Sequence, residues 1–152
     1  MDVDLGRLAA DVSELYEAAA EERGLRIAVA TEPGLVVRGH DQILALAVSN
    51  LVDNALKHAP PGSTITVSTE IADGRPALVV DDRGPGIPEA DRTRALDRFV
   101  RLDPSRSGAG TGLGLALVAS VARMHGAAIE LGDNRPGLRA ALRFPAEGTT
   151  PI

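Results

Sequence analysis

The residues best suited to chemistry lie at positions 49–58, a segment with the periodicity of a helix. At about 100° per residue, Asn50, Asn54 and Lys57 fall within roughly 60° of one another and form one polar stripe. An amide oxygen can ligate Mg²⁺ and an ammonium can neutralise phosphate oxygens, so the stripe suits a metal–phosphate ligand. A solvated helix face could carry the same residues, and the stripe alone does not separate the two interpretations. Lys57 is the single lysine among 16 lysines and arginines, which favours a need for a compact ammonium there.

A glycine-rich cluster at residues 82–88 directly follows an apolar, strand-like run. Asp82 stands at the end of that run and Gly84 and Gly86 follow it. The carboxylate can accept a hydrogen bond from an exocyclic amine such as that of adenine, and the glycines let the backbone approach a flat ligand. Asp-x-Gly is also a common turn sequence, so this cluster is a weak signal by itself.

A second glycine cluster, at residues 108–114, leads straight into an apolar helical pattern. Backbone N–H groups at such a helix start form an anion site, although the spacing fits neither the Walker nor the Rossmann pattern. Between the two clusters lie Phe99 and Arg101. The phenylalanine could pin a mobile lid to the core and the arginine could approach phosphate oxygens, with a solvated charged turn as the alternative.

The elements that must position these clusters follow from periodicity and turn signals. Asp41 stands where an N-cap would begin the stripe helix, and residues 81–114 form a loop long enough to be a functional lid. The expected helices span residues 5–22, 41–58 and about 113–125, and the expected strands span 25–29, 35–37, 63–71, 77–80, 128–131 and 138–144. This order predicts an α+β fold with a mixed, largely antiparallel sheet and helices on one face.

Composition limits the classes of protein that this chain can represent. Its 152 residues suit a single domain, 1–152, with a core at about 5–144, a lid at about 84–111 and a frayed tail at 146–152. The net charge of −5 argues against a nucleic-acid partner, and the absence of cysteine excludes disulfides. No apolar run approaches the roughly 18 residues that span a membrane, and no signal peptide is evident, so we expect no direct membrane insertion of this chain.

In this order, the four clusters resemble the N, G1, F and G2 boxes of the ATP-binding catalytic domain of bacterial sensor histidine kinases. The resemblance covers about residues 5–144, and the ordered set of boxes is highly specific. It implies the Bergerat fold of the gyrase superfamily: a two-layer α/β sandwich in which about three helices cover one face of the sheet. The nucleotide would lie between the N-box helix and a flexible ATP lid.

The resemblance also implies ATP and Mg²⁺ as cofactors and assigns roles to single residues. Asn54 would ligate the metal, Asn50 and Lys57 would contact the phosphates as catalytic residues, and Asp82 would recognise the adenine amino group. Arg83 departs from the Asn or Asp of many members, at a position expected to point away from the base. The remaining nucleotide contacts carried over by motif are His58, Gly84, Gly86, Ile87, Phe99, Arg101, Gly110, Thr111, Gly112, Leu113 and Gly114.

Asn50 separates the reactions known in this superfamily. Gyrase-like ATPases and anti-sigma serine kinases typically place a glutamate base there, and a carboxamide cannot deprotonate water or a hydroxyl. An imidazole acceptor needs less help, because it is a nucleophile in its neutral form. The sequence thus favours phosphoryl transfer to a histidine. A nucleotide-binding regulatory module without transfer remains an alternative, as does an ATPase or serine kinase of the gyrase superfamily.

The implied partners lie outside this chain. None of His40, His58 and His125 has the context of a phosphoacceptor. We therefore expect the acceptor on a separate dimerisation domain of the parent kinase, with a response regulator as an indirect partner. The chain itself is expected to be a monomer, at the cytoplasmic end of a membrane-bound sensor.

Overall fold

A computed structural model describes residues 1–96 and 114–146 of the chain. The helices are α1 (Leu5–Glu22), α2 (Asp41–His58), α3 (Arg92–Ala95) and α4 (Gly114–Met124), with a 3₁₀ turn at Glu89–Asp91. The strands are β1 (Asp2–Asp4), β2 (Arg26–Ala30), β3 (Val36–Arg38), β4 (Thr64–Ala72), β5 (Arg75–Asp81), β6 (Ala128–Asp133) and β7 (Leu138–Arg143).

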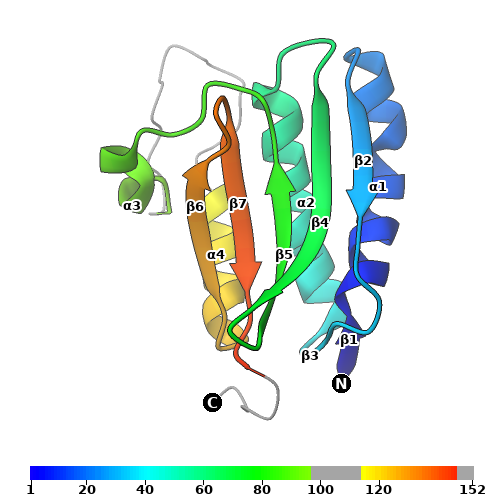
Figure 1. The fold of residues 1–152 in the computed structure, drawn as a ribbon, viewed down its shortest axis with the longest axis vertical. Coiled ribbons are helices and arrows are strands. Elements are labelled where there is room, and N and C mark those ends of the chain that lie inside the picture. Colours follow the sequence, from blue (N-terminus) through cyan, green and yellow to red (C-terminus); the bar gives the residue numbers. More distant parts are fainter. Residues whose placement is uncertain (97–113, 147–152) are drawn as a thin grey trace.

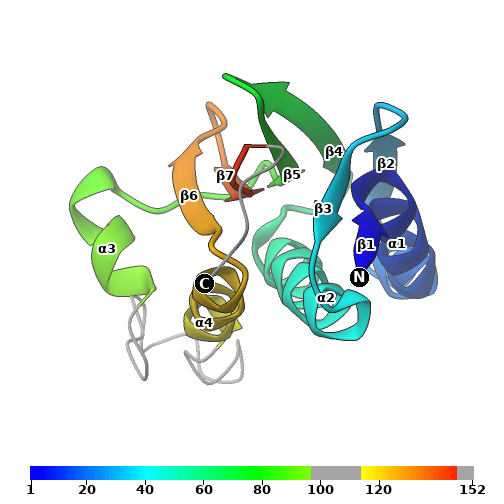
Figure 2. The same ribbon diagram turned by 90° about the horizontal axis from the view of Figure 1, so that it is seen from below.

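Five strands form one sheet in the order β2-β4-β5-β7-β6. The β2–β4 pair is parallel and the other three pairs are antiparallel, so the sheet is mixed and mostly antiparallel. Helices α1, α2 and α4 all lie against one face of this sheet, as the two perpendicular views show (Figures 1 and 2). The predicted α+β sandwich, with about three helices on one face, is therefore confirmed.

Helix α2 is the central helix of the layer, between α1 and α4 (Figure 2). Its apolar arc packs into the core, because residues at helical spacing share one face. The residues of that arc are at most 2% exposed: Leu44, Val48, Leu51, Val52 and Ala55. Since the buried arc is fixed against the sheet and the neighbouring helices, the opposite polar arc of α2 has a fixed direction as well.

The start of α2 differs from the expectation at one residue. Asp41 was expected as the N-cap, but the N-cap is His40 and Asp41 is the first helical residue. The carboxylate of Asp41 accepts a hydrogen bond from the backbone N–H of Gln42 at 2.8 Å instead of capping the helix. A negative charge in the first turn still complements the helix dipole.

A buried histidine explains why the chain enters α2 at His40. The backbone N–H of His40 donates to Nε2 of His125 at 3.1 Å, and Nδ1 of His125 lies 2.8 Å from the carbonyl oxygen of Val121. A carbonyl only accepts, so Nδ1 carries the proton and Nε2 is the acceptor. His125 is 2% exposed and thereby fastens the end of α4 to the start of α2.

Three short elements are not predicted from the sequence: β1, the 3₁₀ turn and α3. Strand β1 pairs with β3 in a separate two-stranded sheet, which buries Val3 and Val37 beside the N-terminus of α1. The 3₁₀ turn and α3 lie within the expected lid, beyond the β6 edge of the sheet in both views (Figures 1 and 2). All three elements are too short to show a hydrophobic period. Residues 97–113 and 147–152 lie outside the described part, which leaves the rest of the lid and the tail as predictions.

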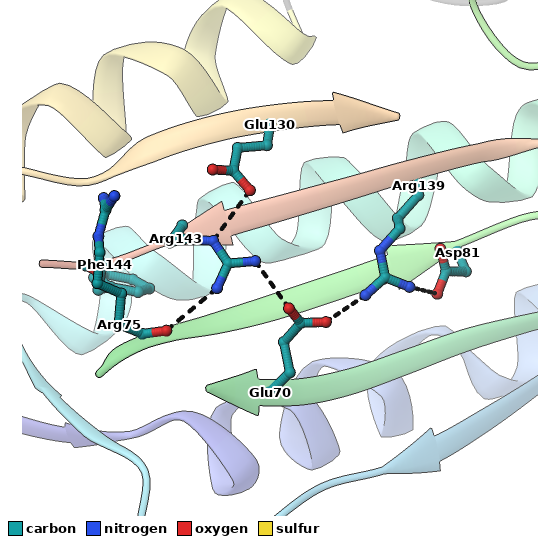
Figure 3. A network of polar contacts seen from close by, with 7 residues as sticks. All are labelled: Glu70, Arg75, Asp81, Glu130, Arg139, Arg143 and Phe144. Atoms are coloured by element: carbon teal, nitrogen blue, oxygen red, sulfur yellow. Dashed lines mark hydrogen bonds and ion pairs between the residues drawn. The ribbon is translucent and has the colours of Figure 1, made fainter. Parts of the chain in front are cut away.

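The face of the sheet away from the helices carries a network of charged side chains (Figure 3). Arg143 donates to Glu70 at 2.9 Å and to Glu130 at 3.1 Å, while Arg139 pairs with Glu70 and, at 3.1 Å, with Asp81. These side chains lie over small residues of β5 and β7 that are buried without a covering helix: Ala77, Val79 and Ala141. The long stems of the arginines shield apolar surface in this way.

The network shifts the ionisation of its members. The hydrogen bond from Arg143 is the largest cause of a lowered pKa at Glu70, ahead of burial, which opposes it, and of the charge of Arg139. Burial raises the pKa of Asp81 and outweighs the attraction of Arg139. No helix in residues 1–96 and 114–146 combines the length and apolar character needed to cross a membrane.

Candidate functional site

The predicted polar stripe is present on the solvent side of α2. Asn50, Asn54 and Lys57 lie on the arc opposite the buried residues, none of them fully buried. The side-chain amide nitrogen of Asn50 donates to the carbonyl oxygen of Leu46 at 2.8 Å, and its Oδ1 lies near the start of α4. Lys57 forms an ion pair with Asp53 one turn earlier, at 3.0 Å. This partly exposed ion pair with Asp53 positions the Lys57 ammonium but contributes little to stability.

The end of α2 is shaped by His58. Its Nδ1 donates to the backbone carbonyl of Asn54 at 2.8 Å, which leaves Nε2 available to another group. The helix stops at Ala59, whose extended backbone leads into Pro60. His58 is half-buried and lies at the C-terminal end of the stripe.

Asp82 is the best-defined residue of the site. It is 3% exposed, and it extends the pairing of β5 with β7 because its N–H donates to the carbonyl of Leu138 at 3.0 Å. Its carboxylate oxygen Oδ1 accepts from the N–H of Gly84 at 2.8 Å and from the N–H of Leu138 at 3.2 Å. Both backbone donors end on Oδ1, so within the described residues Oδ2 is the oxygen left to receive an outside donor.

The first glycine cluster is fixed by close contacts on both sides. A Cβ on Gly84 would lie 2.4 Å from the carbonyl oxygen of His58, at the end of α2. Gly86 has a φ of +73°, and a Cβ there would lie 2.7 Å from the carbonyl oxygen of Gly137. Side chains other than hydrogen would force the backbones apart. The loop is thus held between α2 and the turn that joins β6 to β7.

The described part of the second glycine cluster reaches the stripe. Gly114 begins α4, and a Cβ on it would lie 3.6 Å from Oδ1 of Asn50. The start of α4 therefore lies beside the stripe of α2. Ile87 lies at the beginning of the lid, where its carbonyl accepts from Nε of Arg92 at 3.1 Å.

The structure brings together three of the four predicted clusters, through residues on α2, the 82–87 loop and the first residue of α4. The other predicted contacts lie outside the described residues and remain predictions: Phe99, Arg101, Gly110, Thr111, Gly112 and Leu113. No described contact tests the role that was assigned to any single site residue.

Sequence reasoning missed the turn between β6 and β7 as part of the site. Nδ2 of Asn134 donates to the backbone carbonyl of Asp82 at 2.6 Å, and Gly137 is so close that a Cβ on it would lie 1.9 Å from the same oxygen. The sequence identified residues 132–137 only as a connection between strands. The one local hint in the sequence is Gly137, the last residue of the turn. That this residue adopts a φ of +120° becomes evident only from the folded structure.

Comparison with known proteins identifies the family. Residues 39–148 match the family described as histidine kinase-, DNA gyrase B- and HSP90-like ATPases. This match covers more than half of the chain and spans every box of the site. The chain therefore belongs to this family, and it resembles the catalytic domain of sensor histidine kinases within it.

Curated relatives point to the same branch. The chain is 40% identical over 154 aligned residues, covering 95% of the chain, to the sensor protein IrlS of Burkholderia pseudomallei. It is 43% identical over 124 residues, covering 78% of the chain, to the signal transduction histidine-protein kinase/phosphatase MprB of Mycobacterium sp. strain KMS. It spans 31% of the length of the first relative and 24% of the second, so it corresponds to one part of such proteins.

Solved structures share the fold over the whole chain. A structure of the mycobacterial sensor histidine kinase MprB superposes with a TM-score of 0.83 at 31% identity, covering 100% of this chain and 99% of that one. Full-length ShkA in complex with AMPPNP superposes with a TM-score of 0.84 at 29% identity, covering 100% of this chain and 32% of that one. These neighbours confirm the predicted catalytic-domain fold.

Proposed function

We propose that this chain binds MgATP and transfers the γ-phosphoryl group to a histidine on a separate dimerisation and acceptor domain. One observation carries the proposal: Oδ2 of a buried Asp82 is left free by its backbone partners, in a loop that touches the end of the stripe helix. The family match and the AMPPNP bound to the ShkA neighbour support a nucleotide as the ligand.

The base would be recognised by Asp82. Asp82 is 3% exposed, and its backbone partners both bind Oδ1, so Oδ2 can accept a hydrogen bond from a ligand donor in a largely desolvated setting, where such a bond counts most. The 6-amino group of adenine is such a donor, whereas the 6-oxo group of guanine would place two acceptors against each other. Gly84 and Gly86 themselves carry no side chain that could cover the base.

The phosphates would extend along α2 toward the start of α4. Lys57 would neutralise phosphate oxygens, exchanging its exposed pair with Asp53 for a ligand of higher charge. Asn54 fits Mg²⁺, since its amide oxygen is a hard ligand and its side chain makes no hydrogen bond to the described residues. When bound, Mg²⁺ would neutralise the charge that develops on the transferred group.

Asn50 favours a histidine acceptor over water or serine. Its amide cannot take a proton, and its nitrogen is already engaged by Leu46. In the proposed step a neutral imidazole nitrogen of the acceptor attacks the γ-phosphorus, the bond to the β–γ bridging oxygen breaks, and ADP leaves with the electron pair. The imidazole then releases the proton of its other nitrogen. Asn50 would orient the phosphates without acting as a base.

We also propose where the partners of this reaction reside. The acceptor histidine and the dimer contacts would reside in the remaining length of a parent kinase, and a response regulator would receive the phosphoryl group from it. The chain would work as a monomeric unit on the cytoplasmic side. Its own three histidines do not serve as acceptors, and His125 has both ring nitrogens occupied.

A calorimetric titration tests the proposal. ATP and ADP are titrated into the full chain with and without Mg²⁺, and into Asp82→Ala and Asn54→Ala. We expect saturable binding of both nucleotides, loss of binding in Asp82→Ala, and loss of the Mg²⁺ dependence in Asn54→Ala.

Transfer is then measured with radiolabelled ATP and an acceptor domain from a relative. Label on the acceptor histidine, absent with Asn54→Ala, supports the kinase. Binding without transfer to any acceptor would support the regulatory module instead. Rapid phosphate release by the chain alone would contradict the role assigned to Asn50.

A further inference from the structure

We propose that Asn134 is a positioning residue for adenine recognition, acting through Asp82 without touching the nucleotide. This inference rests on the proposed function and adds a residue to it. Asn134 is the first residue of the turn between β6 and β7, and its side chain reaches across 52 positions of sequence to the strand that ends at Asp81.

The turn and the first residue of β7 hold the polar groups of Asp82 from one side. The carbonyl of Asp82 accepts from Nδ2 of Asn134 at 2.6 Å, its N–H donates to the carbonyl of Leu138 at 3.0 Å, and its Oδ1 accepts from the N–H of Leu138 at 3.2 Å. The N–H of Gly84 supplies the other bond to Oδ1. With these four bonds made, by Asn134 of the turn, Leu138 of β7 and Gly84, the direction of Oδ2 is fixed.

Asn134 also holds the turn itself. Its N–H donates to the carbonyl of Gly137 at 3.0 Å, which closes the turn, and its carbonyl accepts from Nη1 of Arg83 at 3.3 Å. The side chain and backbone of one residue thus connect the turn with both Asp82 and Arg83. Arg83 is exposed, and its bond to Asn134 fastens the outer side of the loop.

A donor is required at this position. Gly137 lies directly against Asp82, where a Cβ would be 1.9 Å from the carbonyl oxygen, so that oxygen is shut off from bulk water on the side of the turn. Without Nδ2 this carbonyl would lose its partner, and the peptide plane between Asp82 and Arg83 would be free to rotate. Rotation there would displace the carboxylate and weaken its bond to an amino group.

The test compares two nucleotides that differ only at the amino group. ATP and purine riboside triphosphate, which carries hydrogen at C6, are titrated with Mg²⁺ into the wild-type chain, Asn134→Ala and Asn134→Asp. The aspartate keeps the shape but has no N–H to donate. Both variants should weaken ATP binding by about tenfold and change the binding of purine riboside triphosphate by less than about twofold.

Glu130→Ala is the matched control. Glu130 lies on β6, the strand that leads into the turn; it is exposed and contacts Arg143 on the outer face of the sheet. It should leave the binding of both nucleotides unchanged. Circular dichroism checks that each variant is folded. If Asn134→Ala does not fold, the comparison is made with Asn134→Asp alone.

The outcomes separate the two proposals. Equal weakening of both nucleotides would show a general structural role for Asn134 and overturn the inference, as would unchanged ATP binding in both variants. A folded wild-type chain that binds neither nucleotide would instead overturn the proposed function. Loss confined to ATP would establish Asn134 as a positioning residue for the amino group.

Discussion

Replacing His125 by alanine should destabilise the whole domain, because this ring joins the two helices on which the site is built. The side chain is 2% exposed and uses both nitrogens, at 2.8 Å to Val121 and 3.1 Å to His40. Truncating a buried aromatic ring costs about 3–5 kcal/mol. That range comes from phenylalanine and tryptophan, whose rings are larger than imidazole, and the two freed backbone groups can form hydrogen bonds with water instead. We therefore expect the free energy of unfolding to fall by about 3–4 kcal/mol.

Urea denaturation followed by circular dichroism measures this loss. For a slope of about 2 kcal/mol per molar, the midpoint should fall by roughly 1.5–2 M urea. His40→Ala is the control, since this exposed ring meets His125 edge-on at a centroid distance of 5.9 Å, while its backbone N–H remains in place. It should cost less than about 1 kcal/mol. If His125→Ala costs no more than His40→Ala, the link between α4 and α2 does not stabilise the domain as argued.

Two further variants test other parts of the structure. Glu70→Gln should lower stability by about 1 kcal/mol at pH 7. The hydrogen bond from Arg143 lowers the pKa of Glu70 below its ordinary value of 4.5. The stability that the ionised Glu70 contributes is therefore present above pH 4.5 and is lost as the pH falls through the lowered pKa. Urea denaturation should show a smaller stability difference between wild type and Glu70→Gln at pH 3 than at pH 7, and an equal difference at both would refute the assignment. Gly84→Ala would place a Cβ 2.4 Å from the carbonyl oxygen of His58. We expect the free energy of unfolding to fall by about 1–3 kcal/mol and ATP binding, measured by calorimetry, to weaken. Unchanged ATP affinity would show that the loop can shift without consequence.

The long elements were predictable because each carries a complete local signal. Helix α1 was expected and found at Leu5–Glu22, where Oδ1 of Asp4 accepts from the N–H of Arg7 at the start and Gly24 adopts a φ of +70° after the end. The alternation of β4 between Thr64 and Ala72 likewise follows the period of a strand with one buried face. Such patterns depend on residues that are near one another in the sequence.

The boundaries and the supports of the site depend on contacts between distant residues, which no local pattern contains. Asp41 has the chemistry of an N-cap, yet His125, 85 positions after His40, determines where the helix begins. Asp82 and its glycines were found because they form a compact motif. Asn134 was missed because an asparagine in a turn is ordinary until its partner across the sheet is known.

The geometry of the stripe on α2 is therefore determined by neighbours rather than by the helix alone. At its start α2 is bound to His125, in its middle Asn50 meets the first residue of α4, and at its end His58 contacts Gly84. The contacts at Asn50 and His58 join α2 to segments that would themselves hold part of the nucleotide, and the contact at His125 fixes the opposite end of α4. A shift of α2 along its axis would thus change the distances from the stripe to both glycine clusters at once. We conclude that variants at these contacts should alter nucleotide affinity even where the altered residue cannot reach the ligand.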